Sequence, residues 1–163
     1  MTYEIDELDR VIEAPEFGQS CTVSPWPLVL AGESLLVLTY YMSHDQPEGS
    51  AQLVFVTSSG CSLHFMGLPN DEALAGHPLA RRGLEWYGAY RVENSSLVRL
   101  MERRNSVHPG HDRVKDRLLQ RQHHIFKFKE NTFECVTNGL NTLIEGIEPA
   151  DRIPRMMELF RSL

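Results

Sequence analysis

The sequence lacks the features that mark membrane-spanning and secreted proteins. Its longest mostly apolar stretch, residues 26–42, is interrupted by Gly32, Glu33 and Ser34, whereas a spanning helix needs about 18 consecutive apolar residues. The first residues are acidic, where a secretion signal would have a basic segment followed by an apolar one. We therefore expect a soluble protein of the cytoplasm with no membrane partner.

Cysteine is scarce as well. Cys21, Cys61 and Cys135 lie far apart in the sequence, and an odd number without short spacings indicates neither a disulfide framework nor a zinc-binding motif. We expect reduced thiols. Cys135 could act as a nucleophile with His123 or His124, or it could fill the core as a small hydrophobic residue.

No complete catalytic or phosphate-binding motif is present. The chain has no Gly-x-Ser-x-Gly turn, no Gly-x-x-x-x-Gly-Lys-Ser/Thr loop and no Gly-x-Gly-x-x-Gly loop. These are the usual signatures of α/β-hydrolases, nucleotide hydrolases and dinucleotide-binding enzymes. Their absence favours a non-enzymatic protein, and the sequence predicts no cofactor.

Basic residues are missing from much of the chain, although the net charge is only −6. Residues 1–20 carry six acids and one base, residues 21–80 carry no lysine or arginine, and residues 81–129 carry twelve bases against five acids. The basic segment could neutralise the acidic half within one fold or across a homodimer. It could alternatively line a nucleic-acid groove, which the overall acidity disfavours. The arginines of such a groove would be Arg99, Arg103, Arg104, Arg113, Arg117 and Arg121.

The middle of the chain reads as β-sheet. Short runs rich in β-branched and aromatic residues at 35–42, 52–57 and 61–66, separated by turn residues, predict an antiparallel meander. Residues 84–92 predict a further strand. The acidic segment of residues 1–20 reads equally well as a short helix or as a loose arm.

Helices follow in the second half. Asn94 or Ser95 is suited to cap a helix that ends near Arg104, and a second helix is expected over about residues 111–120. Asp151 would cap a C-terminal helix with one apolar side. The whole pattern predicts an α+β fold: a largely antiparallel sheet, made of a meander plus a C-terminal hairpin, with two or three packed helices in a single domain over residues 21–163.

The C-terminal hairpin covers residues 124–136. With a two-residue turn at Glu130–Asn131, Phe128 would face Phe133 on a buried aromatic side, and Lys127 would face Glu134 on the other side. This register predicts an exposed cross-strand ion pair between Lys127 and Glu134.

Histidines provide a candidate metal site. His108 and His111 are three apart, a spacing that returns to about the same face of a helix, and a carboxylate would complete a set of two imidazoles and one oxygen ligand. The candidate metal ligands are His77, His108, His111 and Asp112. Without a metal, the same polar segments could bind a ligand or a partner through Asn70, Asp71, Glu72, His77, Asn105, His108 and His111.

An aromatic group lies on the strand predicted over 84–92. Trp86, Tyr87 and Tyr90 could stack against a ligand, or they could belong to the core of the sheet with one polar tip exposed.

Three segments, residues 66–79, 105–111 and 124–135, resemble a family of bacterial proteins of unknown function. The resemblance implies a bacterial, cytoplasmic origin. It implies no activity, cofactor or site residue.

These observations favour a non-enzymatic binding or accessory module with a protein partner, or a homodimer. One alternative is a small metal-dependent enzyme, either hydrolytic or oxygen-dependent, built on the histidine and carboxylate cluster with a divalent metal. The other is a nucleic-acid-binding accessory protein that uses the arginine-rich helices.

Overall fold

Two antiparallel sheets and two α-helices make up the computed structural model, which describes residues 4–23, 25–42, 52–111 and 120–163. The first sheet has the strand order β1–β6–β7–β8–β5, and the second sheet has the order β2–β3–β4–β9. The strands of the first sheet are β1 (Arg10–Glu13), β5 (Cys61–Gly67), β6 (Gly88–Glu93), β7 (Gln122–Lys127) and β8 (Thr132–Thr137). Those of the second sheet are β2 (Leu28–Ala31), β3 (Leu36–Tyr41), β4 (Gln52–Ser58) and β9 (Asn141–Gly146).

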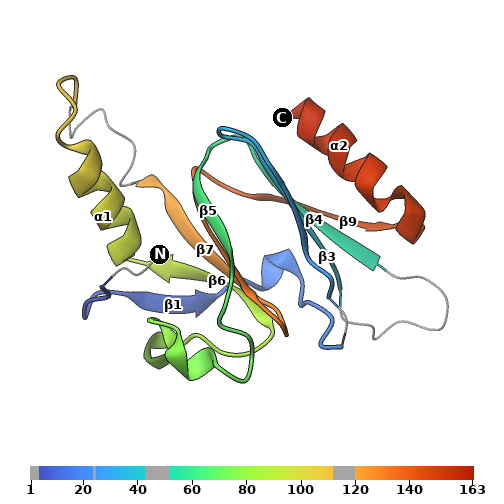
Figure 1. Ribbon diagram of the computed structural model, residues 1–163, viewed down its shortest axis with the longest axis horizontal. Coiled ribbons are helices and arrows are strands. Elements are labelled where there is room, and N and C mark those ends of the chain that lie inside the picture. The colour runs from blue at the N-terminus through green and yellow to red at the C-terminus, as the bar shows by residue number, and fades with distance from the viewer. Residues whose placement is uncertain (1–3, 24, 43–51, 112–119) are drawn as a thin grey trace.

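The sheets face each other, and each carries a helix on its outer side (Figure 1). Helix α1 (Ser96–Asn105) packs on the first sheet, and helix α2 (Arg152–Ser162) packs on the second. Short 3-10 turns follow β1 (η1, Pro15–Phe17), lie between β5 and β6 (η2, Leu74–Gly76; η3, Ala80–Arg82) and precede α2 (η5, Pro149–Asp151). No helix among the described residues is long and apolar enough to cross a bilayer.

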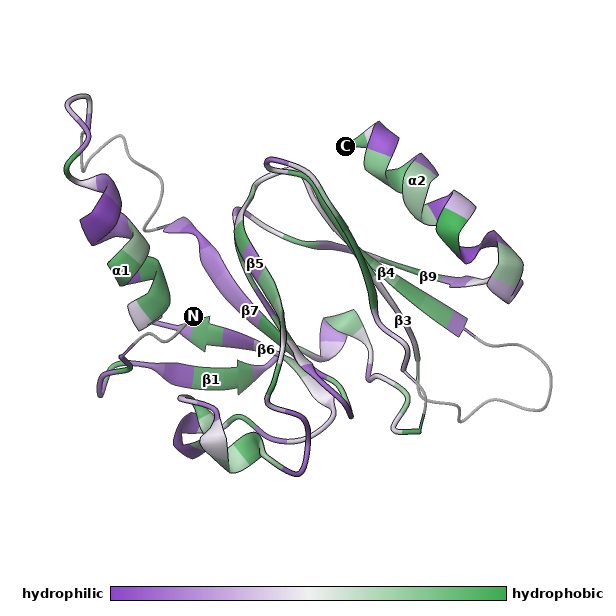
Figure 2. Ribbon diagram, in the orientation of Figure 1, coloured by the Kyte–Doolittle hydropathy of each residue, from purple (hydrophilic) through white to green (hydrophobic). Residues whose placement is uncertain are grey.

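Three apolar clusters follow from this layering. The middle cluster lies between the sheets and includes Leu38, Phe126 and Phe133. A second cluster lies under α1 and the turns η2 and η3, and a third lies under α2 around Phe55. Strands covered on both faces need apolar side chains throughout, and Figure 2 shows β3 and β4 as mostly hydrophobic.

Two short connections carry the chain from one sheet to the other. β4 leads into β5 and β8 leads into β9, and these strands also pair, β5 with β8 and β4 with β9. The hydroxyls of Ser58 and Thr137 are hydrogen-bonded, and Asn138 N–H donates to the Gly60 carbonyl at 3.1 Å. These two connections between the sheets, which we call the crossings, are therefore hydrogen-bonded to each other.

Several sequence predictions are confirmed. Strands β3, β4 and β5 coincide with the three predicted runs, and α1 begins after Ser95, whose hydroxyl accepts a hydrogen bond from Val98 N–H. Helix α2 follows Asp151, although the Asp151 side chain makes no capping hydrogen bond. The helix predicted over residues 111–120 lies almost wholly outside the described residues.

The predicted meander is confirmed for β3 and β4, which pair, but it is wrong for its third strand. β5 pairs with β8 in the first sheet and not with β4, because the chain changes sheets at Ser59–Gly60. The acidic N-terminal segment, predicted as a short helix or a loose arm, forms no α-helix among its described residues and is only partly an arm. Residues 10–13 form β1, which pairs with β6, so part of the acidic N-terminal segment is an edge strand of the first sheet. Strands β2 and β9 were not predicted.

The register of the C-terminal hairpin is also wrong, by one residue at the turn. Phe128 N–H donates to the Asn131 carbonyl at 2.9 Å, so the turn residues are Lys129 and Glu130. Lys127 then faces Thr132, and Glu134 faces Ile125. Lys127 and Glu134 do not form an exposed pair: both side chains are buried.

Candidate functional site

A pocket of about 340 Å³ lies at the start of β6, between that strand and the turn η1. Its walls combine one exposed aromatic ring, that of Trp86, with two tyrosines and two carboxylates. We call it the aromatic pocket, and the lining residues that the argument uses are Glu13, Glu85, Trp86, Tyr87, Gly88 and Tyr90.

The aromatic wall is held in place from the polar loop after β5. Trp86 is 62% exposed, yet its indole N–H donates to the Asp71 carbonyl at 3.1 Å. The Tyr87 hydroxyl donates to the Asp71 carboxylate at 2.6 Å. This bond lowers the pKa of Asp71 and raises that of Tyr87. A large apolar ring kept exposed by a hydrogen bond is available to a ligand.

Tyr87 has a left-handed backbone, with φ at 51°. This conformation is costly for a bulky residue and persists only where the surroundings impose it. Here the two hydrogen bonds to Asp71 and the start of β6 impose it, so the rings of Trp86 and Tyr87 have fixed positions.

The pocket also has an acidic part, formed by Glu13 and Glu85. Tyr90 is 3% exposed, and its hydroxyl lies within the field of Glu13 and Glu85. Burial, reinforced by these two carboxylates, raises the pKa of Tyr90 to about 12. A carboxylate from β1 and one from the segment before β6 therefore act on the same small volume.

The base of the pocket is rigid. The Tyr40 hydroxyl, reaching over from the second sheet, donates to the Phe17 carbonyl, and Ala14 N–H donates to the Ala89 carbonyl at 2.9 Å. Both bonds anchor η1 against the sheets. A pocket with fixed walls loses little conformational entropy when a ligand binds.

An exposed indole in the same pocket as two carboxylates favours one chemical class of ligand. The negative face of an indole attracts a cation, and two carboxylates select a positive charge and repel a negative one. The aromatic pocket is suited to an ammonium or guanidinium group.

A second cluster of polar residues lies buried beneath α1, on the opposite face of the first sheet from the middle cluster. Glu134 accepts at one carboxylate oxygen from His77 Nε2 and at the other from His123 Nε2, both at 2.8 Å. His77 Nδ1 accepts from Leu79 N–H at 3.1 Å, and His123 Nδ1 lies 2.9 Å from the Ser95 hydroxyl. We call these residues the histidine–glutamate network.

The carboxyl group of this network is held in its ionised form. Burial by itself would raise the pKa of Glu134, but the hydrogen bonds from His123 and His77 outweigh burial and lower it to about 2. Glu134 is therefore ionised at neutral pH, and the network attaches the loop that carries His77 to strands β7 and β8.

The three candidate metal ligands that the structure describes, His77, His108 and His111, have different partners. His77 contacts Glu134, His111 Nε2 lies 3.1 Å from a carboxylate oxygen of Glu102 in α1, and His108 is exposed and accepts from Gly110 N–H. Asp112 lies outside the described residues. Within the described part of the chain, no group of three or more His, Cys, Asp or Glu residues could hold a metal ion.

The other residues predicted to bind a ligand have varied positions. Asn70 accepts from Ala73 N–H at 3.1 Å and shapes the loop, Asp71 holds the aromatic wall, and Glu72 is exposed. Asn105 ends α1, and its carbonyl accepts from His108 N–H. Only Asp71 of this set takes part in the aromatic pocket. Glu13 and Glu85 were missed because nothing in the sequence indicates that they converge.

Cys135 faces the middle cluster, where burial raises the pKa of its thiol well above the usual range. His123 lies on the opposite face of the sheet, within the histidine–glutamate network. A protonated thiol in an apolar core is a poor nucleophile, which supports the packing interpretation.

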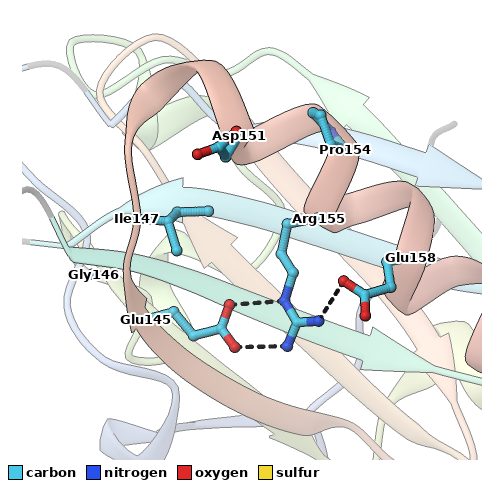
Figure 3. A pocket seen from close by; sticks show the side chains of 7 residues that line it. All are labelled: Glu145, Gly146, Ile147, Asp151, Pro154, Arg155 and Glu158. Carbon is cyan, nitrogen blue, oxygen red and sulfur yellow. Dashed lines mark hydrogen bonds and ion pairs between the residues drawn. The ribbon is translucent and has the colours of Figure 1, made fainter.

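A larger hollow of about 610 Å³ lies between β9 and α2. Figure 3 shows its main charge, Arg155, held between Glu145 and Glu158. The guanidinium donates twice to Glu145, at 2.6 and 2.9 Å, and once to Glu158 at 2.7 Å. These groups bind one another, so the hollow offers a ligand less than the aromatic pocket does.

Comparison of the chain with protein-family models, with curated protein sequences and with solved structures finds no match. The case for a function therefore depends on the geometry of the chain itself.

Proposed function

We propose that the protein is a binding module that takes up a lysine or arginine side chain of a partner protein in the aromatic pocket. The observation that carries the proposal is that Glu13 and Glu85 both act on Tyr90 and line one pocket together with Trp86, which is fixed and exposed. A cation bound there would have both carboxylates and the Trp86 indole in the lining around it.

The binding free energy expected for the aromatic pocket favours a protein partner over a free amine. Two exposed ion pairs contribute about 0.2–1 kcal/mol each, and an exposed cation–π contact contributes about 0.5–1 kcal/mol. The total of about 1–3 kcal/mol falls short of the roughly 4 kcal/mol of a millimolar complex. The pocket can therefore serve as a specificity anchor within a larger interface, and a free metabolite would bind too weakly.

The charge layout supports a basic partner. Residues 1–80 carry eleven acidic residues and a single basic one, Arg10, and the pocket includes Glu13 from this acidic half. Such a field attracts a basic segment and speeds the encounter at low salt. We propose the cytoplasm as the place of action, in keeping with the three free cysteines.

A nuclear magnetic resonance titration locates the site. The ¹⁵N-labelled protein is titrated with N-acetyl-arginine amide, a cation without a carboxylate. We expect the largest shifts at the Trp86 indole N–H and at the backbone amides of Glu85 and Tyr87, with a dissociation constant above about 1 mM. Shifts centred on other elements, with none at Trp86, would refute the proposal.

The carboxylates are tested by matched variants. Glu85→Gln is expected to weaken binding about two- to fivefold, because one ion pair is lost. Glu72→Gln, an exposed carboxylate outside the pocket lining, is expected to leave the affinity unchanged. Equal weakening by both variants would indicate only a general charge effect.

A further inference from the structure

The C-terminal end of β6 leads into a turn that positions Ser95, the first residue of a second polar group. β6 ends at Glu93, Asn94 takes a left-handed backbone with φ at 51°, and α1 begins at Ser96. A sharp turn between a strand and a helix therefore fixes Ser95. Ser95 lies five residues along the chain from Tyr90, the nearest lining residue of the aromatic pocket, which is about 17 Å along an extended strand.

Ser95 begins a line of three hydrogen-bonded side chains from three different elements. Its hydroxyl lies 2.9 Å from His123 Nδ1 in β7, and His123 Nε2 lies 2.8 Å from a carboxylate oxygen of Glu134 in β8. A hydroxyl, an imidazole and a carboxylate in this order are the groups of a serine nucleophile, its general base and the group that orients the base. One bond joins the start of α1 to β7 and the other joins β7 to β8, so distant segments of sequence converge here.

The direction of each hydrogen bond follows from the neighbours. Val98 N–H donates to the Ser95 oxygen at 3.3 Å, which leaves the hydroxyl hydrogen free to point at His123 Nδ1. His123 then carries its proton on Nε2 and donates it to Glu134. This tautomer, assigned from the network, leaves Nδ1 able to accept the serine proton.

Ser95 also lines a cavity of about 260 Å³. Arg99 and Arg121 line the same cavity, and the first turn of α1 adds a partial positive charge there. Arg99 is paired with Asp6, while Arg121 donates to the Gly60 carbonyl at 2.7 Å. Because a backbone carbonyl does not neutralise a guanidinium, the charge of Arg121 favours an anionic group next to the serine.

We propose that Ser95, His123 and Glu134 form an acyl-transfer site that hydrolyses an ester whose acyl group carries a carboxylate. This inference is independent of the aromatic pocket and of its ligand.

The reaction balances without a cofactor. The Ser95 oxygen forms a bond to the acyl carbon while its proton passes to His123 Nδ1, and the same proton then leaves with the alcohol. Water attacks the acyl-serine, gives a proton to His123, and the acid is released as that proton returns to the Ser95 oxygen. Glu134 keeps the imidazole oriented and stabilises its charge.

Labelling by a fluorophosphonate tests the nucleophile. The full chain is incubated with a fluorophosphonate probe and analysed by intact mass and peptide mapping. We expect one adduct per chain, on Ser95. Ser95→Asn keeps a helix-capping oxygen and is expected to lose the adduct while its circular dichroism stays unchanged. Ser106→Ala, which removes an exposed serine at the end of α1, is expected to label as the wild type does.

The substrate class is tested with two esters. We expect hydrolysis of p-nitrophenyl hemisuccinate to exceed that of p-nitrophenyl acetate about tenfold in kcat/KM, and we expect Arg121→Gln to remove the preference. Glu134→Gln is expected to reduce the rate of Ser95 labelling at least tenfold. No adduct on Ser95 in the folded wild-type protein, or adducts spread over several serines at similar rates, would overturn the proposal.

Discussion

Glu134 accepts hydrogen bonds from two imidazoles in the interior of the protein. Replacing it with glutamine puts an amide N–H opposite one imidazole donor and leaves that donor unpaired. We expect Glu134→Gln to lower the free energy of unfolding by about 2–3 kcal/mol, as for a lost hydrogen bond to a buried charge. Urea denaturation at pH 7 measures the change.

A nearby carboxylate provides the control for that variant. Glu130 is an exposed residue of the β7–β8 turn, and Glu130→Gln is expected to change the free energy of unfolding by less than about 0.5 kcal/mol. If the two variants are equally stable, the histidine–glutamate network does not stabilise the fold.

His124 gives the protein a pH-dependent stability. Burial, with smaller contributions from His123 and Arg91, lowers the pKa of His124 from 6.5 to about 4. The unfolded chain therefore binds a proton at a higher pH than the folded protein does. Stability from this residue is complete above about pH 6.5 and falls on the order of 3 kcal/mol as the pH decreases to about 4.

A variant isolates that contribution. We expect His124→Gln to flatten the dependence of unfolding free energy on pH between 6.5 and 4, measured by urea denaturation across the range. His64→Gln, at an exposed position on β5, is expected to keep the wild-type slope. An unchanged slope in His124→Gln would contradict this account.

Within strand β6, the packing of Tyr90 requires that position 88 has no side chain. A Cβ there would lie 3.0 Å from the Tyr90 hydroxyl and 3.2 Å from its ring. We expect Gly88→Ala to displace Tyr90, to destabilise the protein by about 1–3 kcal/mol as overpacking does, and to weaken arginine amide binding.

A double-mutant cycle separates this contact from general strain. In a Tyr90→Phe background the closest atom, the hydroxyl oxygen, is gone, so Gly88→Ala should cost less than in the wild type. Thermal unfolding of the four proteins gives the coupling. Additive effects would show that Tyr90 is not what excludes a side chain at this position.

Elements with strong local signals could be predicted from the sequence. β3 and β4 are continuous apolar runs, and Ser95 has the capping chemistry that begins α1. β9 could not be predicted, because it is an edge strand with a largely exposed and polar sequence. The turn of the β7–β8 hairpin was misplaced because Lys129–Glu130 lacks the glycine or asparagine that normally marks such a turn.

The two sheets are joined by the two crossings, and the chain is closely packed there. A Cβ at Gly60 would lie 2.6 Å from Asn138 Nδ2, while one at Gly139 would meet nothing within 4 Å. We expect Gly60→Ala to lower the free energy of unfolding by about 1–3 kcal/mol and Gly139→Ala to change it little. Equal melting temperatures for the two variants would contradict the described packing of the crossings.

The division of the strands into two sheets explains why sequence patterns did not predict the pairing of β5 or the aromatic pocket. An apolar run indicates that a strand is buried but does not indicate which strand it pairs with. For this reason β5 was predicted to pair with β4, whereas it pairs with β8. The same limit hid the aromatic pocket, where Glu13, Asp71 and Trp86 come from three separate segments. The aromatic group was predicted either to stack against a ligand or to belong to the core of the sheet. In the structure Tyr90 is buried and Trp86 is exposed.

The selectivity of the aromatic pocket for charge is the most direct test of the proposed function. N-acetyl-arginine amide and N-acetyl-citrulline amide have nearly the same shape and differ in charge. We predict that the wild type binds the arginine compound at least about fivefold more tightly, and that Glu13→Gln/Glu85→Gln removes the difference. Equal affinities in the wild type, or a preference that survives in the double variant, would contradict the account.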